Sequence, residues 1–263
     1  MNYAIGDVAR TLGLTPGALH YFEREGVISS KKGGGARRTY GAEDIIRLIS
    51  YRKYRSMEMP LKEIARQFSP EGDDCQTIAG KMRCQQLEAQ KAAQRFEQLA
   101  GDIAWFAGHT ALAAGRIGII DVDCLPESYV LRVGSEGFIS RSRAEQAHVA
   151  HWLEHMPAVR ITSAREPDGR ACLCYSVDAA RAEQLGLHNT PGAVLLRRQA
   201  ALHTFVRIGV SYYDQPQLAF APLLDYARAH AFEQSSTALS ISLCVECHGS
   251  CRDTIAEVWL PIG

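Results

Sequence analysis

The chain has 263 residues, 46% of them hydrophobic, and its formal net charge is zero. This length suits two domains and a linker, and the apolar fraction excludes a wholly disordered chain. Residues 1–70 contain twelve Lys or Arg against seven Asp or Glu, whereas the remaining 193 residues contain seventeen against twenty-two. A basic end and a mildly acidic remainder favour a nucleic-acid-binding module joined to a second domain.

The sequence shows no secretory signal and no apolar run long enough to span a membrane. We therefore expect a cytoplasmic protein. In that compartment the eight cysteines are expected as free thiols rather than as a disulfide framework.

Residues 5–26 predict two short helices joined by a tight turn that contains Gly13. Thr15 is a residue type that caps a helix start, and Pro16 suits the first helical position. Gly26 suits the end of the second helix, because a residue in left-handed geometry often closes a helix. Two short helices with such a turn predict a helix-turn-helix, although periodicity alone also fits any helical hairpin.

The second helix has an inner and an outer face. Leu19 and Phe22 are three residues apart and are expected to face inward. His20, Tyr21 and Arg24 are then expected to face outward, where they could reach nucleic acid.

Residues 29–40 follow as a predicted wing. Three consecutive glycines form its tip, and its cations are Lys31, Lys32, Arg37 and Arg38. A solvated loop is the alternative, but a loop this basic beside a candidate recognition helix favours contact with a phosphate backbone.

At this point the chain resembles the MerR family of transcription regulators. The resemblance covers about the first seventy residues and rests on YAIGDVA at residues 3–9, TPGALHYFEREGVI at residues 15–28, and RTY at residues 38–40 followed by EDI at residues 43–45. His20 stands where the family usually has Arg, and His is shorter and mostly neutral at pH 7. The resemblance implies a winged helix-turn-helix, a homodimer, and double-stranded promoter DNA that is bent and untwisted in the presence of RNA polymerase.

The expected DNA contacts divide into two groups. The groove or its rim is expected to be contacted from the second helix, and phosphates from the wing. The full set is Thr15, Pro16, Gly17, His20, Tyr21, Arg24, Lys31, Lys32, Arg37, Arg38 and Tyr40.

Two further helices are predicted before residue 74. Gly41 can cap the first of them, and Met59-Pro60 separates it from the second, which starts near Leu61. We place the boundary of an all-α winged helix-turn-helix domain at residues 1–74.

Residues 75–116 carry the clearest periodicity of the chain. Apolar or small residues alternate at spacings of three and four, with one polar step at Gln85, and this predicts a coiled-coil helix. The seam consists of Cys75, Ile78, Met82, Gln85, Ala89, Ala92, Phe96, Leu99, Ile103 and Phe106. The alternative is a single amphipathic helix that packs on its own core. We favour self-association, and the family resemblance implies an antiparallel dimer helix.

Residues 117–263 predict an α+β domain in two similar halves, each with the order strand, helix, strand, strand. Predicted strands lie at residues 117–122, 128–133, 171–177, 193–197, 201–208, 238–244 and 254–262, and predicted helices at residues 144–152 and 220–231. This part resembles the gyrase-inhibitor-like (GyrI-like) effector-binding domain. The residues that carry the resemblance are 125–130 and 255–262, and it implies a sensor of small molecules.

The last strand suggests how such a sensor reads its ligand. Its alternation places Ile255, Glu257 and Trp259 on one face. Burying a carboxylate is costly unless it is paired, so Glu257 is the candidate reader of a cationic ligand. The alternative is a solvent-exposed Glu on an edge strand.

Aromatic side chains provide stacking surfaces for flat or cationic organic molecules. Each candidate below could also be an ordinary core residue. The predicted ligand-binding set is Tyr129, Trp152, Tyr175, Phe205, Tyr212, Tyr213, Glu257 and Trp259.

Residues 244–251 contain a Cys-x-x-Cys-His string in an expected hairpin loop. Haem attachment requires export, for which no signal is seen. The alternative function for the chain is a metal or thiol-redox sensor that uses Cys244, Cys247, His248 and Cys251. Our prediction includes no metal and no cofactor.

Catalytic motifs do not stand out in the sequence. We find no defensible Ser/His/Asp group, no Walker loop and no His-Glu-x-x-His. A small-molecule hydrolase, as found in some GyrI-like proteins, remains an alternative in which Glu257 would act with a neighbouring Tyr. We predict a regulator rather than an enzyme, with an organic small-molecule effector.

Overall fold

The computed structural model describes residues 2–32, 38–68, 72–133, 142–209, 215–248 and 251–263, excluding the side chains of Lys32, His248 and Cys251. The chain divides into two compact units, residues 1–95 and residues 96–263. The boundary falls within one long helix, so each unit is described by itself.

The first unit combines short helices with a small sheet. Its helices are α1 (Ile5–Leu12), α2 (Pro16–Arg24), α3 (Ala42–Ser56) and α4 (Leu61–Gln67), and its strands are β1 (Asn2–Ala4), β2 (Lys31–Lys32) and β3 (Arg38–Gly41). The strands pair in the order β1-β3-β2. The prediction of an all-α domain was therefore wrong, because backbone pairing between β1 and β3 leaves no periodic signal in the sequence.

Local signals define the helix-turn-helix as predicted. The Thr15 hydroxyl accepts a hydrogen bond from the Ala18 amide at 3.1 Å, and Pro16 is the first residue of α2. Gly13 and Gly26 have φ values of 60° and 72°, which glycine adopts without steric cost. Buried Leu19 packs in one core with Phe22, Tyr40 and Leu48 of the same unit.

Helix α5 (Cys75–Arg116) has 42 residues and covers the range predicted for the coiled-coil helix. Near its start, Asp74 accepts a hydrogen bond from the Thr77 amide at 2.7 Å. In the second unit the apolar seam lies open to solvent, with Phe96 69%, Leu99 36% and Ile103 56% exposed. The alternative of an amphipathic helix buried on its own core does not apply to these three side chains.

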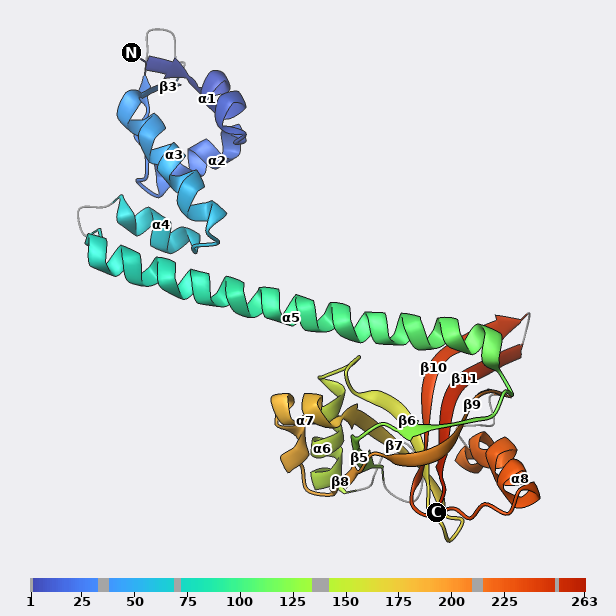
Figure 1. Ribbon diagram of the computed structural model, residues 1–263. Helices are drawn as coiled ribbons and strands as arrows, with labels where there is room; N and C mark the ends of the chain where they lie inside the picture. The colour runs from blue at the N-terminus through green and yellow to red at the C-terminus, as the bar shows by residue number, and fades with distance from the viewer. Residues whose placement is uncertain (1, 33–37, 69–71, 134–141, 210–214, 249–250) are drawn as a thin grey trace. The chain divides into compact units, whose positions relative to one another are not determined.

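The second unit is built on one antiparallel sheet (Figure 1). Its strands are β4 (Asp121–Leu125), β5 (Ser128–Arg132), β6 (Arg160–Arg165), β7 (Ala171–Asp178), β8 (Ala193–Leu196), β9 (Gln199–Gly209), β10 (Ala238–His248) and β11 (Cys251–Pro261). They lie in the order β4-β9-β11-β10-β6-β7-β5-β8. The helices are α6 (Arg143–Leu153), α7 (Ala179–Leu185) and α8 (Ala221–Ala229), with short 3-10 helices η1 (Leu187–Asn189) and η3 (Pro216–Phe220).

Both halves have the predicted order of strand, helix, strand and strand, but the first half contains β6, which was not among the predicted strands. The first half is β5-α6-β6-β7 and the second is β9-α8-β10-β11. In the sheet, the second half reads β9-β11-β10 and the first half reads β6-β7-β5, so the two orders are reversed about the central pair of β10 and β6. Strand β6 and helix α7 were missed by the sequence analysis.

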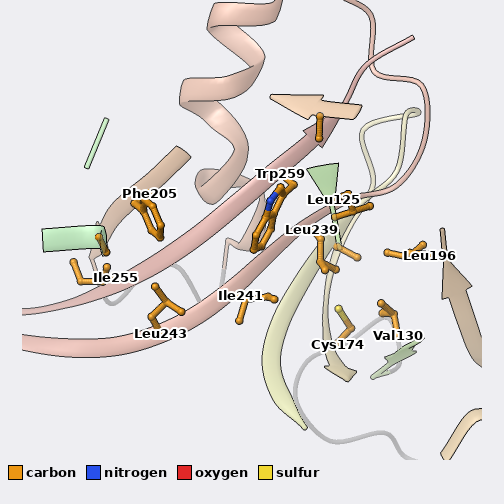
Figure 2. Close-up of a cluster of buried hydrophobic side chains, with 13 residues drawn as sticks. Leu125, Val130, Cys174, Leu196, Phe205, Leu239, Ile241, Leu243, Ile255 and Trp259 are labelled. Atoms are coloured by element: carbon orange, nitrogen blue, oxygen red, sulfur yellow. The ribbon is translucent and has the colours of Figure 1, made fainter. Parts of the chain in front are cut away.

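Helices cover both faces of this sheet. On one face, Ile255 and Trp259 belong to a core that includes Ala113 of α5. Figure 2 shows Trp259 of this core near Leu239 and Ile241. On the other face, Val258 packs with α8 residues, and a separate cluster contains residues of α6 and α7. The second part of α5 and the remaining helices therefore pack on opposite faces of the sheet.

Within the described residues, no helix is long and apolar enough to cross a membrane.

Candidate functional site

The predicted DNA-binding residues occupy several kinds of position. Thr15, Pro16, Gly17, His20, Arg24 and Lys31 are exposed, and Tyr21 and Arg38 are half-buried. Tyr40 is fully buried, so it is a core residue rather than a surface contact for phosphate. Arg37 and the Lys32 side chain lie outside the described residues.

Glu23 connects the second helix to the wing strand. Its carboxylate accepts a hydrogen bond from the Tyr40 hydroxyl at 3.1 Å and lies 3.2 Å from the Arg38 guanidinium. His20 Nδ1 lies 3.3 Å from the same carboxylate, and His20 also contacts Arg38. Burial raises the pKa of Glu23, but hydrogen bonds from Ser30, His20 and Tyr40 and the charge of Arg38 outweigh it and lower the pKa. The sequence analysis did not single out Glu23, because its partners Arg38 and Tyr40 lie on a strand far along the chain.

A cavity of about 480 Å³ lies between α5 and the sheet of the second unit. Its walls combine aromatic, basic and acidic side chains from α5, β4, β6, β7, α7 and β11. The lining residues are Gly101, Asp102, Trp105, His109, Asp123, Cys124, Pro126, Ala158, Arg160, Asp178, Arg181, Glu257 and Trp259. A concave site with an aromatic surface and a few converging charges is typical of small-molecule binding.

Glu257 is only 3% exposed and is held by two histidines. Its Oε1 lies 2.9 Å from Nε2 of His203, and its Oε2 lies 2.5 Å from Nδ1 of His109 on α5. His203 Nδ1 in turn lies 3.0 Å from the carboxylate of Asp121, which also pairs with Arg116. Glu257 is therefore buried and paired within the protein, so the alternative of a solvent-exposed edge residue was wrong, and its role as the reader of a cationic ligand stays a prediction.

Burial lowers the pKa of His203, but hydrogen bonds to Glu257 and Asp121 and the charges of these carboxylates outweigh it and raise the pKa. A raised pKa in the folded state stabilises the fold fully below the unfolded value, near 6.5, and this stabilisation is lost as the pH rises through the folded value.

We therefore expect His203→Gln to lower the melting temperature more below pH 6.5 than well above it. Thermal unfolding of the full chain at several pH values measures this difference. His151→Gln, at an exposed histidine of α6, is the control. A melting-temperature loss that is the same at every pH would contradict a charged His203.

Two arginines line the cavity and differ in the groups that they contact. Arg181 lies 3.7 Å from Asp102 of α5. Arg160 places its guanidinium carbon 3.6 Å from the ring centre of Trp105, which stacks on His109 at 4.0 Å. Among the described residues, no hydrogen-bond partner exists for the buried Nε atoms of Arg160 and Arg181 or for the indole nitrogen of Trp259. Unsatisfied buried donors are rare in folded proteins, and the three residues that carry these donors all line the cavity.

The predicted ligand-binding residues are only partly brought together. Glu257 and Trp259 line the cavity. Trp152, Tyr175 and Tyr129 belong to the cluster with α6 and α7 on the opposite face of the sheet, where the Trp152 indole donates to Thr190. Phe205 is a core residue beside His203. Tyr212 and Tyr213 lie outside the described residues.

The sequence analysis missed most of the cavity wall. Asp102, Trp105 and His109 are three and four residues apart, so they form a second helical stripe on α5 next to the predicted seam. That spacing was a usable signal. Arg160 carried none, because the strand that holds it was not predicted.

The cysteine motif lies in paired strands and not in a loop, contrary to expectation. Cys244, Cys247 and His248 belong to β10, and Cys251 pairs with His248 from β11. Cys244 is partly buried against the core, whereas Cys247 is exposed. The side chains of His248 and Cys251 lie outside the described residues. Among the side chains that the structure describes, no group of three His, Cys, Asp or Glu is arranged to hold a metal ion.

The fold of the first unit, with its exposed second helix and its wing strands, defines a winged helix-turn-helix DNA-binding domain. Residues 3–69 match the family model of the MerR HTH family regulatory proteins. The first unit therefore contains a segment that matches the helix-turn-helix of MerR-type regulators.

A curated relative is the HTH-type transcriptional regulator SkgA of Caulobacter vibrioides, which is 29% identical over 98 residues. The match spans 37% of this chain and 37% of that relative.

Two solved structures are similar over longer stretches. EcmrR in a complex with DNA is 14% identical, with 99% of both chains covered and a TM-score of 0.37. SAV2435 bound to tetraphenylphosphonium is 12% identical, with 55% of this chain and 93% of that chain covered and a TM-score of 0.33. These scores are too low to establish a shared fold, so the GyrI-like nature of the second unit stays a prediction.

Proposed function

We propose that the protein is a homodimeric, ligand-responsive transcription regulator that binds promoter DNA through residues 1–74 and an aromatic cation through residues 117–263 together with the second part of α5. In this proposal residues 75–116 form the dimerisation helix, and RNA polymerase acts at the same promoter. The observation that carries the proposal is that α5 bears both an exposed apolar seam and one wall of the cavity.

The character of the cavity supports a cationic ligand. Its lining includes four carboxylates, Asp102, Asp123, Asp178 and Glu257, but only two arginines. Trp105 and Trp259 add aromatic surface. A cation is attracted both by such carboxylates and by the faces of aromatic rings. An effector of this class also agrees with the role that the sequence analysis predicts for Glu257.

The position of the cavity supports a response of the DNA-binding domain. Asp102, Trp105 and His109 belong to the same continuous helix whose first turns follow the DNA-binding domain. At that end, Lys81 contacts Asp73 at 2.5 Å and Glu63 at 3.4 Å. A ligand that favours one position of α5 would therefore shift the equilibrium between two arrangements of the dimer, provided that it binds one of them better.

The proposal is tested with the purified, reduced full chain. A duplex enriched by selection from a random-sequence library serves as the DNA probe, and tetraphenylphosphonium serves as the aromatic cation. We expect saturable quenching of tryptophan fluorescence by the cation and a changed affinity for the duplex in its presence. Stoichiometric binding of zinc or copper without any response to the cation would favour the metal-sensor alternative instead.

Arg38 is the wing cation whose surroundings the structure describes best. We expect Arg38→Gln to weaken binding to all duplexes by a similar factor and to reduce the slope of log affinity against log salt by about one, because one phosphate contact is lost. Titrations at several salt concentrations measure the slope. Lys62→Gln on α4 is the control, and an unchanged slope in Arg38→Gln would contradict a phosphate contact.

A further inference from the structure

We infer that Arg160 is a built-in competitor of the effector, whose guanidinium occupies the cation-binding face of Trp105 until an aromatic cation displaces it. The inference rests on the proposed cationic effector. It adds a mechanism by which the site excludes cations that bind more weakly than Arg160 does. This inference about Arg160 does not follow from the predicted role of Glu257 as the reader of a cationic ligand.

The first argument is that Arg160 has a buried hydrogen-bond donor without a partner among the described residues. Its guanidinium lies 3.6 Å from the ring centre of Trp105, and its Nε is buried without a hydrogen-bond partner among the described residues. Burial lowers the pKa of Arg160, and the charges of Asp178, Asp102 and Glu257 oppose that effect. A structural arginine usually uses its planar fork of donors for bidentate bonds, and the guanidinium of this one instead lies over an aromatic ring.

The second argument is the nature of the charges around it. Asp178, Asp102 and Glu257 attract Arg160 electrostatically, yet none of them has a hydrogen bond with its guanidinium in the structure. An aromatic face with carboxylates nearby is also the environment that would bind an organic cation, although Glu257 already contacts His203 and His109, and Asp102 already contacts Arg181. Arg160 therefore occupies the position that suits such a ligand.

The same charges argue against an anionic ligand as the partner of Arg160. The cavity already holds four carboxylates, and its other arginine, Arg181, lies close to Asp102. An added anion would be repelled by these groups, since like charges are unfavourable in a poorly solvated site. The exchange keeps the charge of the cavity unchanged if the displaced Arg160 guanidinium moves out of the cavity as the ligand cation enters.

Displacement of Arg160 would have a mechanical consequence. Trp105 belongs to α5 and Arg160 to β6, so their contact joins the helix to the sheet. A cation that takes the Trp105 face exchanges this contact between protein groups for a contact with ligand. Arg160 thus has two effects. It lowers the affinity of every cation that competes for Trp105, and its contact with Trp105 is the link between sheet and helix that an effector must break.

The test uses the full chain and tetraphenylphosphonium. We expect Arg160→Met, which keeps the aliphatic length but removes the charge, to bind this cation roughly tenfold more tightly than the wild type, because the internal cation–π contact no longer competes. Arg160→Lys should stay close to the wild type, since lysine also binds aromatic faces. Arg132→Gln, at an arginine paired with Glu166, is the control. Tryptophan quenching gives the affinities, and thermal unfolding verifies that each variant is folded.

A second measurement does not depend on Arg160→Met alone. Arg160→Ala should bind free phenylguanidinium in the emptied position, whereas the wild type should bind it at least about tenfold more weakly. Equal or weaker binding of tetraphenylphosphonium by Arg160→Met, while the wild type binds it, would overturn the inference and leave the proposed function intact. A preference of the wild type for benzoate that is lost in Arg160→Met would overturn both the inference and the proposed cationic effector. Absence of cation binding in the wild type and in all variants would overturn the proposed function itself.

Discussion

Replacing Phe96 and Ile103 together by Glu is expected to convert the protein from a dimer into a monomer and to lower its affinity for the selected duplex by roughly a hundredfold or more. Both side chains are more than half exposed, and they lie on a seam with 3-4 spacing. Exposed large apolar residues in such a pattern are stabilised when a second helix covers them. A monomer holds only one half-site, so it loses the gain that two linked binding events provide.

Sedimentation measures the oligomeric state, and binding titrations measure the affinity. Gln94→Glu combined with Gln98→Glu adds the same charges to positions outside the predicted seam, and we expect this control to remain dimeric. A Phe96→Glu/Ile103→Glu variant that stays dimeric with unchanged DNA affinity would show that the seam is not the dimer interface.

The second large effect is expected for Glu257→Gln, which should lower affinity for tetraphenylphosphonium by roughly thirtyfold or more. The substitution keeps the shape of the side chain but removes a buried negative charge that attracts the cation. Its amide would also present a donor to His203 or His109, where the carboxylate offers only acceptors.

The decisive comparison is with triphenylphosphine oxide, a neutral aromatic compound of related shape. Its affinity should change far less than that of the cation, because it does not require the charge. Glu246→Gln on strand β10, at a carboxylate paired with Arg207, provides the matched control. Equal losses for the charged and the neutral compound would assign Glu257 a structural role only.

The sequence was informative wherever a feature repeats at short range. Heptad spacing predicted α5, and alternation along β11 correctly separated Glu257 and Trp259 from Val258 on the opposite face. Capping and turn chemistry at Thr15 and Gly26 defined the second helix. Each of these features depends on neighbours within a few residues, which a single sequence displays.

Features that depend on distant partners were missed. Strand β6 has an arginine at each end and buried Thr162 and Ser163 in its middle, so it lacks an apolar pattern. Trp152 and Tyr175 looked like pocket walls, but only the sheet topology reveals that they face the other side. The partners of Glu257 are likewise far away, with His109 on α5 and His203 on β9, so their meeting depends on the tertiary fold.

The arrangement of α5 implies that two cavities in one dimer would not act independently. Ile103 on the seam and Trp105 on the cavity wall are two residues apart, which places them about 200° apart around the helix axis. A ligand that turns the cavity face of α5 must turn the seam as well, and the seam of the other protomer has to follow to keep its packing. Occupation of the first cavity would thus change the ligand affinity of the second cavity. Ligand binding to the dimer should therefore be cooperative. Its Hill coefficient should differ from that of the monomeric Phe96→Glu/Ile103→Glu variant.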